Sequence, residues 1–312
     1  MSKYSQSLDE MEEWLNILYY GEPGSGKTSA AASMAHLGIV YLVDVESGAK
    51  ARPLKKLGVP TKNIRPIQVT SYKELDEFYW FLKQELQDLA DARAAVAAGQ
   101  DVELPPDIAG VVFDSISEIH DQLIRAQVDV RHGKAMKKAT NKHGELAMEV
   151  DDNEFMVELG DRGIVTEQLR TLTRRFRDLP CHCAWVALAK REVDPGGEGV
   201  VYLPQLPPKF GQNLRGFVDV VGYMVKAPGV EDSSGYLGVF RDTGRYKGKD
   251  RFGTLPEVLA HPAFQRVIAT IFEEIDLGTD PVQSTYLRRV RAATVSDDPD
   301  PDQTTLGENP DD

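Results

Sequence analysis

A glycine-rich segment carries the residue types that bind a nucleotide phosphate. It reads Gly21-Glu22-Pro23-Gly24-Ser25-Gly26-Lys27-Thr28, followed by Ser29, and matches G-x-x-x-x-G-K-[S/T] at every fixed position. Glycines let successive backbone N–H groups surround an anion, because no Cβ atom stands in the way. Lys27 is expected to reach the β- and γ-phosphates, and the Thr28 hydroxyl to bind Mg²⁺. The segment therefore predicts a P-loop that binds ATP and Mg²⁺.

Two further apolar runs end in carboxylates that could complete the chemistry. The run at 111–113 ends at Asp114, which we expect to hold Mg²⁺ through water; the alternative is a helix N-cap. The run at 39–43 continues into Asp44 and Glu46. We expect this strand beside the P-loop strand, where its carboxyl end would place Glu46 next to the γ-phosphate. Glu46 is then the base that orients the attacking water, with Asp44 in support; the alternative is two ordinary loop acids.

The elements that must position these residues alternate between strand and helix. Apolar runs at 14–20, 39–43, 64–69, 110–113 and 181–189 predict buried strands. Helices are expected after the P-loop, after a capping box at Ser71 and Glu74, at 166–179 and at 261–275. Residues 219–225 and 236–241 predict two closing strands, and 191–216 a long loop. The pattern predicts an α/β fold with a mainly parallel twisted sheet sandwiched by helices.

Composition and charge predict the organisation of the whole chain. We expect a flexible N-terminus at 1–13, an ATPase domain at 14–275 with a helical, basic insertion around 118–161, an extension at 276–294 and a disordered acidic tail at 295–312. The tail either solubilises the chain, recruits a partner or mimics DNA. Cys181 and Cys183 are interpreted as reduced core thiols. No run approaches the ~18 apolar residues of a membrane span, and the start lacks a signal-peptide core, which predicts a cytoplasmic protein without membrane contact.

The ordered motifs resemble the RecA-like ATPase core. In that family a strand ending Asp-x-Glu carries the catalytic Glu, and a strand ending Asp-Ser is the metal element; here these are 42–46 and 111–115. The chain more closely resembles phage-encoded RecA-like NTPases, which include single-strand annealing recombinases and would work in the host cytoplasm. That resemblance also involves Ser29, Ile116, Leu179-Pro180 and a segment at 204–222, and it covers roughly residues 14–256.

The resemblance implies self-association into a ring or filament, with each site completed by the neighbouring subunit. Lys249 and Arg251 resemble basic fingers that reach the neighbour's γ-phosphate, which would make them catalytic in trans; the alternative is a solvated basic hairpin. Family members often carry Gln at the end of the strand equivalent to 184–189. This chain has Ala189-Lys190 there, and Lys190 is the candidate sensor of the γ-phosphate.

The resemblance further implies that single-stranded DNA binds two loops, about 120–165 and 191–216 here. The basic candidates are Arg131, Lys134, Lys137, Lys138, Lys142, Lys209 and Arg215. They stand out in a chain of net charge -13, although a solvated helix face is the alternative.

The sequence thus favours an ATP- and Mg²⁺-dependent ATPase that binds single-stranded DNA in recombination or annealing, with a single-strand DNA-binding protein as a further partner. The alternatives are a helicase or packaging-type motor with the same core, or a regulatory ATPase whose partner is a protein. An AAA+ remodeller is disfavoured because Ser115, not Glu, follows Asp114.

Overall fold

The computed structural model describes residues 13–45, 50–139, 156–194, 199–226, 235–272, 274–281 and 283–284. The N-terminal half contains β1 (Asn16–Gly21), α1 (Lys27–Ala32), η2 (Ser33–His36), β2 (Ile39–Asp44), α2 (Ala51–Lys56), η3 (Thr61–Asn63), β3 (Ile64–Ile67), α3 (Tyr72–Ala97), β4 (Ile108–Asp114) and α4 (Ile116–Ala139). The C-terminal half contains α5 (Leu159–Arg177), β5 (His182–Val193), β6 (Val200–Pro204), α6 (Pro208–Phe217), β7 (Val220–Lys226), β8 (Tyr236–Val239), β9 (Lys249–Asp250), β10 (Val258–Ala260) and α7 (Phe264–Ile271).

One sheet organises these elements, with strand order β10-β8-β7-β1-β5-β4-β2-β3. The pairings from β7 through β1, β5, β4 and β2 to β3 are all parallel. Strand β8 pairs with β7, and β10 with β8, both in antiparallel register. The closing strands predicted at 219–225 and 236–241 correspond to β7 and β8, whereas the sequence did not predict β10. Two short additions leave this path, because β6 pairs with β5 and β9 pairs with β7. The predicted fold class, a mainly parallel sheet between helices, is confirmed.

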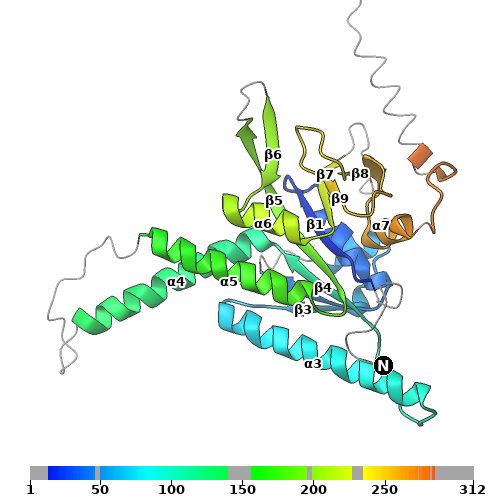
Figure 1. Cartoon of the computed structure of the whole chain (residues 1–312), viewed down its shortest axis with the longest axis horizontal. Coiled ribbons are helices and arrows are strands. Elements are labelled where there is room, and N and C mark those ends of the chain that lie inside the picture. The colour runs from blue at the N-terminus through cyan, green and yellow to red at the C-terminus, as the bar shows by residue number, and fades with distance from the viewer. Residues whose placement is uncertain are drawn as a thin grey trace, which may run out of the picture.

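Both faces of the sheet are covered, so each strand is apolar on two sides (Figure 1). Side chains alternate between the faces with a period of two. In β1, Leu18 and Tyr20 belong to the core under α3, α4, α5 and α6, whereas Ile17 and Tyr19 belong to the core under α1, α2 and α7. The outer parts of α4 and α5 extend away from the sheet as a pair (Figure 1). The ends of the central strands are therefore held in place by packed apolar cores on both faces of the sheet.

The predicted N-cap at the start of α3 is present, but the return bond of the capping box is displaced by one residue. The Ser71 hydroxyl accepts the Glu74 N–H at 3.3 Å. The Glu74 carboxylate reaches back to the Thr70 N–H, one residue before the cap. These two hydrogen bonds satisfy the N–H groups of Glu74 and Thr70 at the start of the helix.

Two sequence predictions about this architecture are wrong. Residues 191–216 are not one loop, because β5 continues to Val193, β6 pairs with it in antiparallel register, and α6 follows with Pro208 in its first turn. Residues 191–216 thus contain part of a strand pair and a helix. The strand β2 is also not beside β1, because β5 and β4 lie between them. Sequence order does not report which strands are neighbours in a parallel sheet.

The remaining regional predictions have mixed outcomes. Cys181 and Cys183 are free and fully buried, and burial raises the pKa of Cys181 to about 12, as expected for inert core thiols. The acidic tail, and all but residue 13 of the predicted flexible N-terminus, lie outside the described residues. None of the helices in the described parts of the chain is long and apolar enough to cross a membrane.

Candidate nucleotide-binding site

The P-loop forms a tight turn between β1 and α1 at the carboxyl edge of the sheet. Gly26, the residue before α1, has a φ of 84°, which L side chains rarely adopt. A Cβ atom there would also lie 2.7 Å from the ring of Tyr236. At Gly21 a Cβ would lie 2.4 Å from the carbonyl oxygen of Met224. Space and backbone conformation therefore both require glycine at position 26, and space alone requires it at position 21.

The Lys27 ammonium group lies inside the loop. Its Nζ donates to the carbonyl oxygens of Gly21 at 3.0 Å and Glu22 at 2.8 Å, and the residue is only 6% exposed. Carbonyl oxygens stabilise the charge of a buried ammonium only in part, because they are neutral acceptors. A phosphate in the loop would add a charged acceptor to these contacts.

The Thr28 hydroxyl and the Asp114 carboxylate contact each other. Thr28 Oγ1 donates to Asp114 Oδ2 at 2.7 Å, although the residues are 86 positions apart. Strand β5 brings them together, because it pairs with β1 on one side and β4 on the other. A hydroxyl and a carboxylate fit Mg²⁺, which prefers oxygen ligands and completes its shell with water and phosphate oxygens. The described residues contain no group of three or more His, Cys, Asp or Glu that would hold a metal without a phosphate.

Asp44 lies next to this pair. It is the direct cross-strand partner of Asp114, and both residues are 8% exposed. The predicted water-orienting residue, Glu46, lies outside the described residues, two positions beyond Asp44. Lys190 lies two residues past Leu188, the partner of Gly21 in β5, and its Nζ pairs with Glu192 at 2.6 Å. Strand β5 thus lies between β1, which leads into the P-loop, and β4, which ends at Asp114, and Lys190 follows these pairings in the part of β5 that pairs with β6.

A pocket of about 220 Å³ opens beside the first turn of α1. Its lining includes Gly26, Ser29, Tyr236, His261 and Gln265. The ring of Tyr236 lies against Gly26, because a Cβ atom at that glycine would be within 2.9 Å of three ring atoms. Such a pocket, with an aromatic wall and a few polar groups beside a phosphate loop, suits a nucleobase. No motif in the sequence indicates it, because Tyr236 comes from β8, far from the P-loop in the chain.

Lys249 and Arg251 are both bound within their own chain, at the opposite, amino edge of the sheet. Lys249 Nζ donates to the carbonyls of Arg215 at 3.0 Å and Val218 at 2.6 Å, after the end of α6. Burial, and then the nearby Arg251 charge, lower the pKa of Lys249. Arg251 pairs with Asp219 at 2.6 Å. Their predicted role in a neighbouring subunit stays a prediction.

The predicted DNA-binding residues are not gathered in one place. Arg131 binds Glu158 at 2.9 Å and Asp161 at 3.3 Å, which ties α4 to the start of α5. Lys134 and Lys209 are exposed, on α4 and α6 respectively. Arg215 is partly buried near the end of α6. The side chains of Lys137 and Lys138, and all of Lys142, lie outside the described residues.

A glycine loop with a buried lysine, a hydroxyl–carboxylate pair and a parallel sheet that presents both at its carboxyl edge define a P-loop NTPase. The family model described as "AAA domain" matches residues 14–252, and the chain belongs to this family. It is a P-loop ATPase domain in which Ser115 follows Asp114.

Comparison with solved structures gives, among others, the crystal structure of the RadB recombinase, with 15% sequence identity, 72% of this chain and 79% of that chain covered, and a TM-score of 0.39. Comparison with curated proteins gives no match.

Proposed function

We propose that this protein hydrolyses ATP with Mg²⁺ and couples the reaction to single-stranded DNA, in recombination or strand annealing. The contact between Thr28 and Asp114 beside Lys27 carries the first part, since it pairs a metal site with a phosphate loop. When bound, Mg²⁺ would neutralise charge on the β- and γ-phosphate oxygens. The chain's own part is to bind the phosphates through loop N–H groups and Lys27, and to hold Thr28 and Asp114 in place.

We assign water activation to Glu46, with Asp44 beside it as a positioning residue. The support is that Asp44 is the cross-strand partner of Asp114, and that Glu46 follows Asp44 by two positions in the sequence. In Glu46→Gln, ATP should bind with near-normal affinity while turnover falls by roughly 100-fold or more. Binding is measured with a fluorescent ATP analogue and turnover by phosphate release. Lost ATP affinity would contradict the role of Glu46.

The base of the nucleotide is proposed to occupy the pocket beside Tyr236 and Ser29. The pocket adjoins Gly26, the last glycine of the loop, so a nucleotide with its phosphates in the loop reaches it directly. The aromatic face of Tyr236 would stack on the base.

The DNA part is tested by ATP turnover with and without single-stranded DNA at two salt concentrations, with Lys27→Ala as the background control. Stimulation that weakens with salt supports the proposal, because phosphate contacts release counterions. Turnover that ignores DNA, together with no DNA binding at low salt, would leave an ATPase with a protein partner. Directional displacement of a duplex strand would favour a motor.

The proposed oligomer, with Arg251 or Lys249 acting in trans, is tested by mixing two inactive variants. Lys27→Ala has a defective phosphate loop and intact fingers, whereas Arg251→Ala has the reverse. If the site is shared, a mixture regains turnover, because some interfaces combine both intact halves. No recovery at any ratio would assign Arg251 only to its contact with Asp219.

A further inference from the structure

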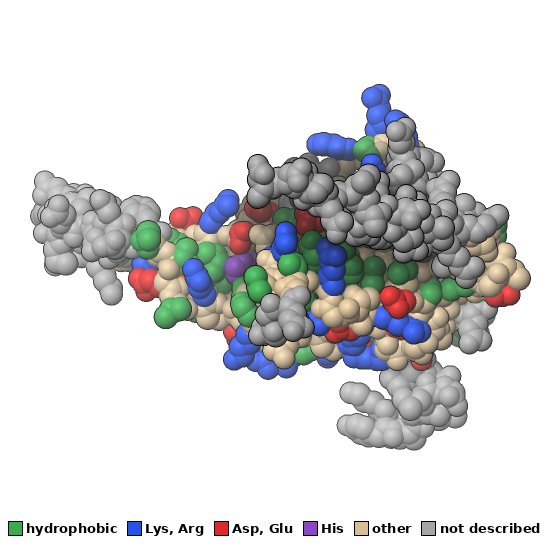
Figure 2. Space-filling view, turned by 90° about the horizontal axis from the view of Figure 1, so that it is seen from above, with side chains coloured by type: hydrophobic (Ala, Val, Ile, Leu, Met, Phe, Trp, Pro, Cys, Tyr) green, Lys and Arg blue, Asp and Glu red, His purple; other side chains and the backbone are tan. Residues whose placement is uncertain are grey.

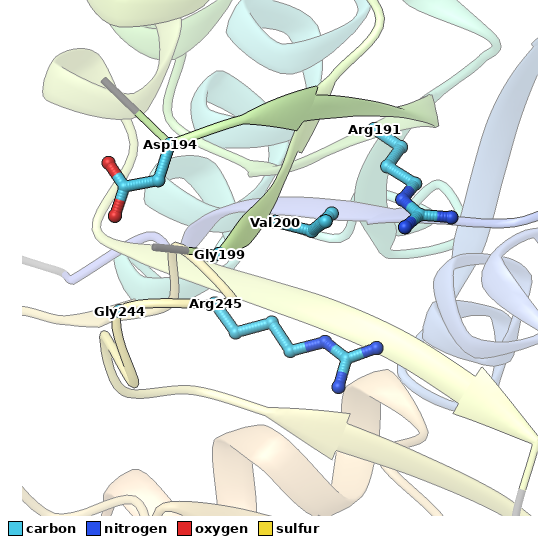
Figure 3. Close-up of a pocket in the computed structure, with 6 residues that line it drawn as sticks. All are labelled: Arg191, Asp194, Gly199, Val200, Gly244 and Arg245. Carbon is cyan, nitrogen blue, oxygen red and sulfur yellow. The ribbon is translucent and has the colours of Figure 1, made fainter. Parts of the chain in front are cut away.

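The pocket beside the first turn of α1 differs from the rest of the surface in its charge. Lys, Arg, Asp and Glu side chains are spread over the face of the molecule seen from above (Figure 2). The larger groove of about 420 Å³ that β5, β6 and residues 244–245 form also has a charged lining, with Arg191, Asp194 and Arg245 (Figure 3). None of the described residues that line the pocket beside α1 is Lys, Arg, Asp or Glu. This pocket therefore suits an uncharged, flat group such as a nucleobase.

The segment that enters α7 forms one wall of this pocket and is fixed to the P-loop strand. The Tyr19 hydroxyl of β1 donates to the Pro262 carbonyl at 3.1 Å, and the His261 N–H donates to the Tyr236 carbonyl of β8 at 2.9 Å. His261 has a φ of 50°, which few residues other than glycine adopt, and it turns the chain toward α7. The wall is thus held by the same strand that positions the phosphates.

Gln265 carries an unusual polar atom in this wall. It lies in the first turn of α7, whose position is fixed because the Phe264 N–H donates to Ser33 Oγ beside α1 at 2.7 Å. Gln265 is partly buried, and its Oε1 is enclosed. Among the residues that the structure describes, no N–H or O–H group donates to this oxygen. Enclosed amide oxygens normally accept a hydrogen bond, so this one is available to a ligand that brings a donor.

Adenine is a base that brings such a donor. Its 6-amino group donates, whereas guanine carries a carbonyl oxygen at the same ring position, and side-chain amides are the usual partners of adenine in proteins. The side chain of Gln265 has three rotatable bonds, so its amide can turn into the pocket while α7 stays in place. The ring of Tyr236, against Gly26 in the same lining, would hold the base by stacking.

We propose that Gln265 selects adenine by accepting a hydrogen bond from the 6-amino group at its Oε1. A purine with an oxygen at position 6 presents an acceptor to an acceptor and leaves the amide oxygen unpartnered. Gln265 is a specificity residue in this proposal and takes no part in the chemical step. The inference rests on the proposed ATP hydrolysis and base pocket, and it adds the contact that distinguishes ATP from other purine nucleoside triphosphates.

The contact is tested by comparing ATP with purine riboside triphosphate, which lacks the amino group but has the same ring system and phosphates. The kcat/KM for each is measured by phosphate release with the full-length protein and Mg²⁺. The unaltered protein should prefer ATP on the order of tenfold. Gln265→Leu should bring the ratio close to one by lowering kcat/KM for ATP alone. Gln100→Leu, at an exposed glutamine after α3, is the control and should keep the preference.

Two further comparisons separate the acceptor from the shape of the side chain. Gln265→Glu keeps an acceptor in the same place, so it should keep the preference for ATP over purine riboside triphosphate; repulsion between its charge and the phosphates affects both nucleotides equally. Inosine triphosphate, with an oxygen at position 6, should be used less well than purine riboside triphosphate by the unaltered protein but not by Gln265→Leu. Thermal unfolding of each variant separates a lost contact from a lost fold.

The outcomes that overturn the inference differ from those that overturn the proposed function. If the unaltered protein uses both nucleotides equally, or if Gln265→Leu leaves the ratio unchanged, Gln265 does not select the base, while ATP hydrolysis stands. An equal fall for both nucleotides in Gln265→Leu assigns the side chain to the shape of the pocket and also contradicts the inference. If neither nucleotide gives turnover that depends on Lys27, the proposed hydrolysis itself fails.

Discussion

The two edges of the central sheet carry the same types of charged residue, but at one edge these residues suit ligand binding and at the other they are paired within the chain. At the carboxyl edge, Lys27, Thr28 and Asp114 surround a loop whose shape fits a phosphate. At the amino edge, Asp219 accepts the Asn16 N–H and pairs with Arg251, so its charge is satisfied within the chain. A lysine or an aspartate is therefore informative only together with its partners. Substitutions at the carboxyl edge should change catalysis within the same subunit, and those at the amino edge should change stability, in addition to the role in trans proposed for Lys249 and Arg251.

The largest effect is expected at Lys27. Lys27→Ala should lower turnover by roughly 100-fold or more, because the γ-phosphate loses its cationic partner. Stability should change less, since the ammonium's hydrogen bonds to Gly21 and Glu22 are made to neutral carbonyl oxygens of its own loop. Phosphate release measures turnover, and thermal unfolding measures stability. Lys62→Ala, at an exposed lysine far from the loop, is the control. Normal turnover in Lys27→Ala would contradict the assignment of the carboxyl edge of the sheet to catalysis.

The next effect concerns His182 at the amino edge. Its Nδ1 accepts the Leu15 N–H at 2.9 Å, and burial lowers its pKa to about 4. The unfolded chain, with a pKa of ~6.5, binds the proton more readily, so stability is complete above that pH and is lost as the pH falls toward 4. The free energy of unfolding should fall by up to about 3 kcal/mol over this range of pH.

Denaturant unfolding between pH 7.5 and 4 measures this dependence. His182→Gln keeps an acceptor for Leu15 and should flatten the curve in that window. His36→Gln, at an exposed histidine, should leave it unchanged. An unaltered slope in His182→Gln would show that other groups cause the dependence.

A smaller loss is expected from Arg251→Ala. Asp219 remains buried without its cation, but Arg251 itself is half exposed, so unfolding free energy should fall by about 1 kcal/mol. Arg93→Ala breaks a pair exposed on both sides and should cost close to nothing. Equal, negligible effects would show that the amino-edge pair is only a surface contact.

The smallest effect is predicted at Tyr236, in the pocket beside the loop. Tyr236→Leu should raise the KM for ATP about fivefold with kcat nearly unchanged, because stacking on the base contributes equally to substrate and transition state. Tyr236→Phe keeps the ring and should behave normally. A fall in kcat at unchanged KM would place Tyr236 in the chemical step and contradict the base pocket.

The sequence predicts those features that depend on residues close together in the chain. The P-loop residues are contiguous, and Asp114 ends a buried strand, so the two residues that meet in the Thr28–Asp114 hydrogen bond can both be selected from the order of residues alone. The same is true of the Ser71–Glu74 cap. The position of β2 could not be recognised, because β4 and β5 insert between it and β1 through pairings distant in the chain.

Long-range pairing also explains the residues that sequence reasoning missed. Tyr236 reaches Gly26 only because β8 is added after β7 at the sheet edge. Gln265 reaches the same pocket only because the start of α7 is tied to Ser33 beside α1. Conversely, Arg131 belongs to a basic stretch in the sequence, yet its guanidinium binds Glu158 and Asp161. Counting charges cannot show which of them are already paired.

The side chain of Gln283 has a consequence for association between molecules. Its amide oxygen accepts the Ala260 N–H at 2.9 Å, and its amide nitrogen donates to the Val258 carbonyl at 2.8 Å. It thereby occupies hydrogen-bonding positions that the outermost strand, β10, would otherwise offer to another chain. A protein shortened so that it ends before residue 276 would uncover this edge and should self-associate through β-strand addition. Affinity tags and fusions are best joined after residue 284.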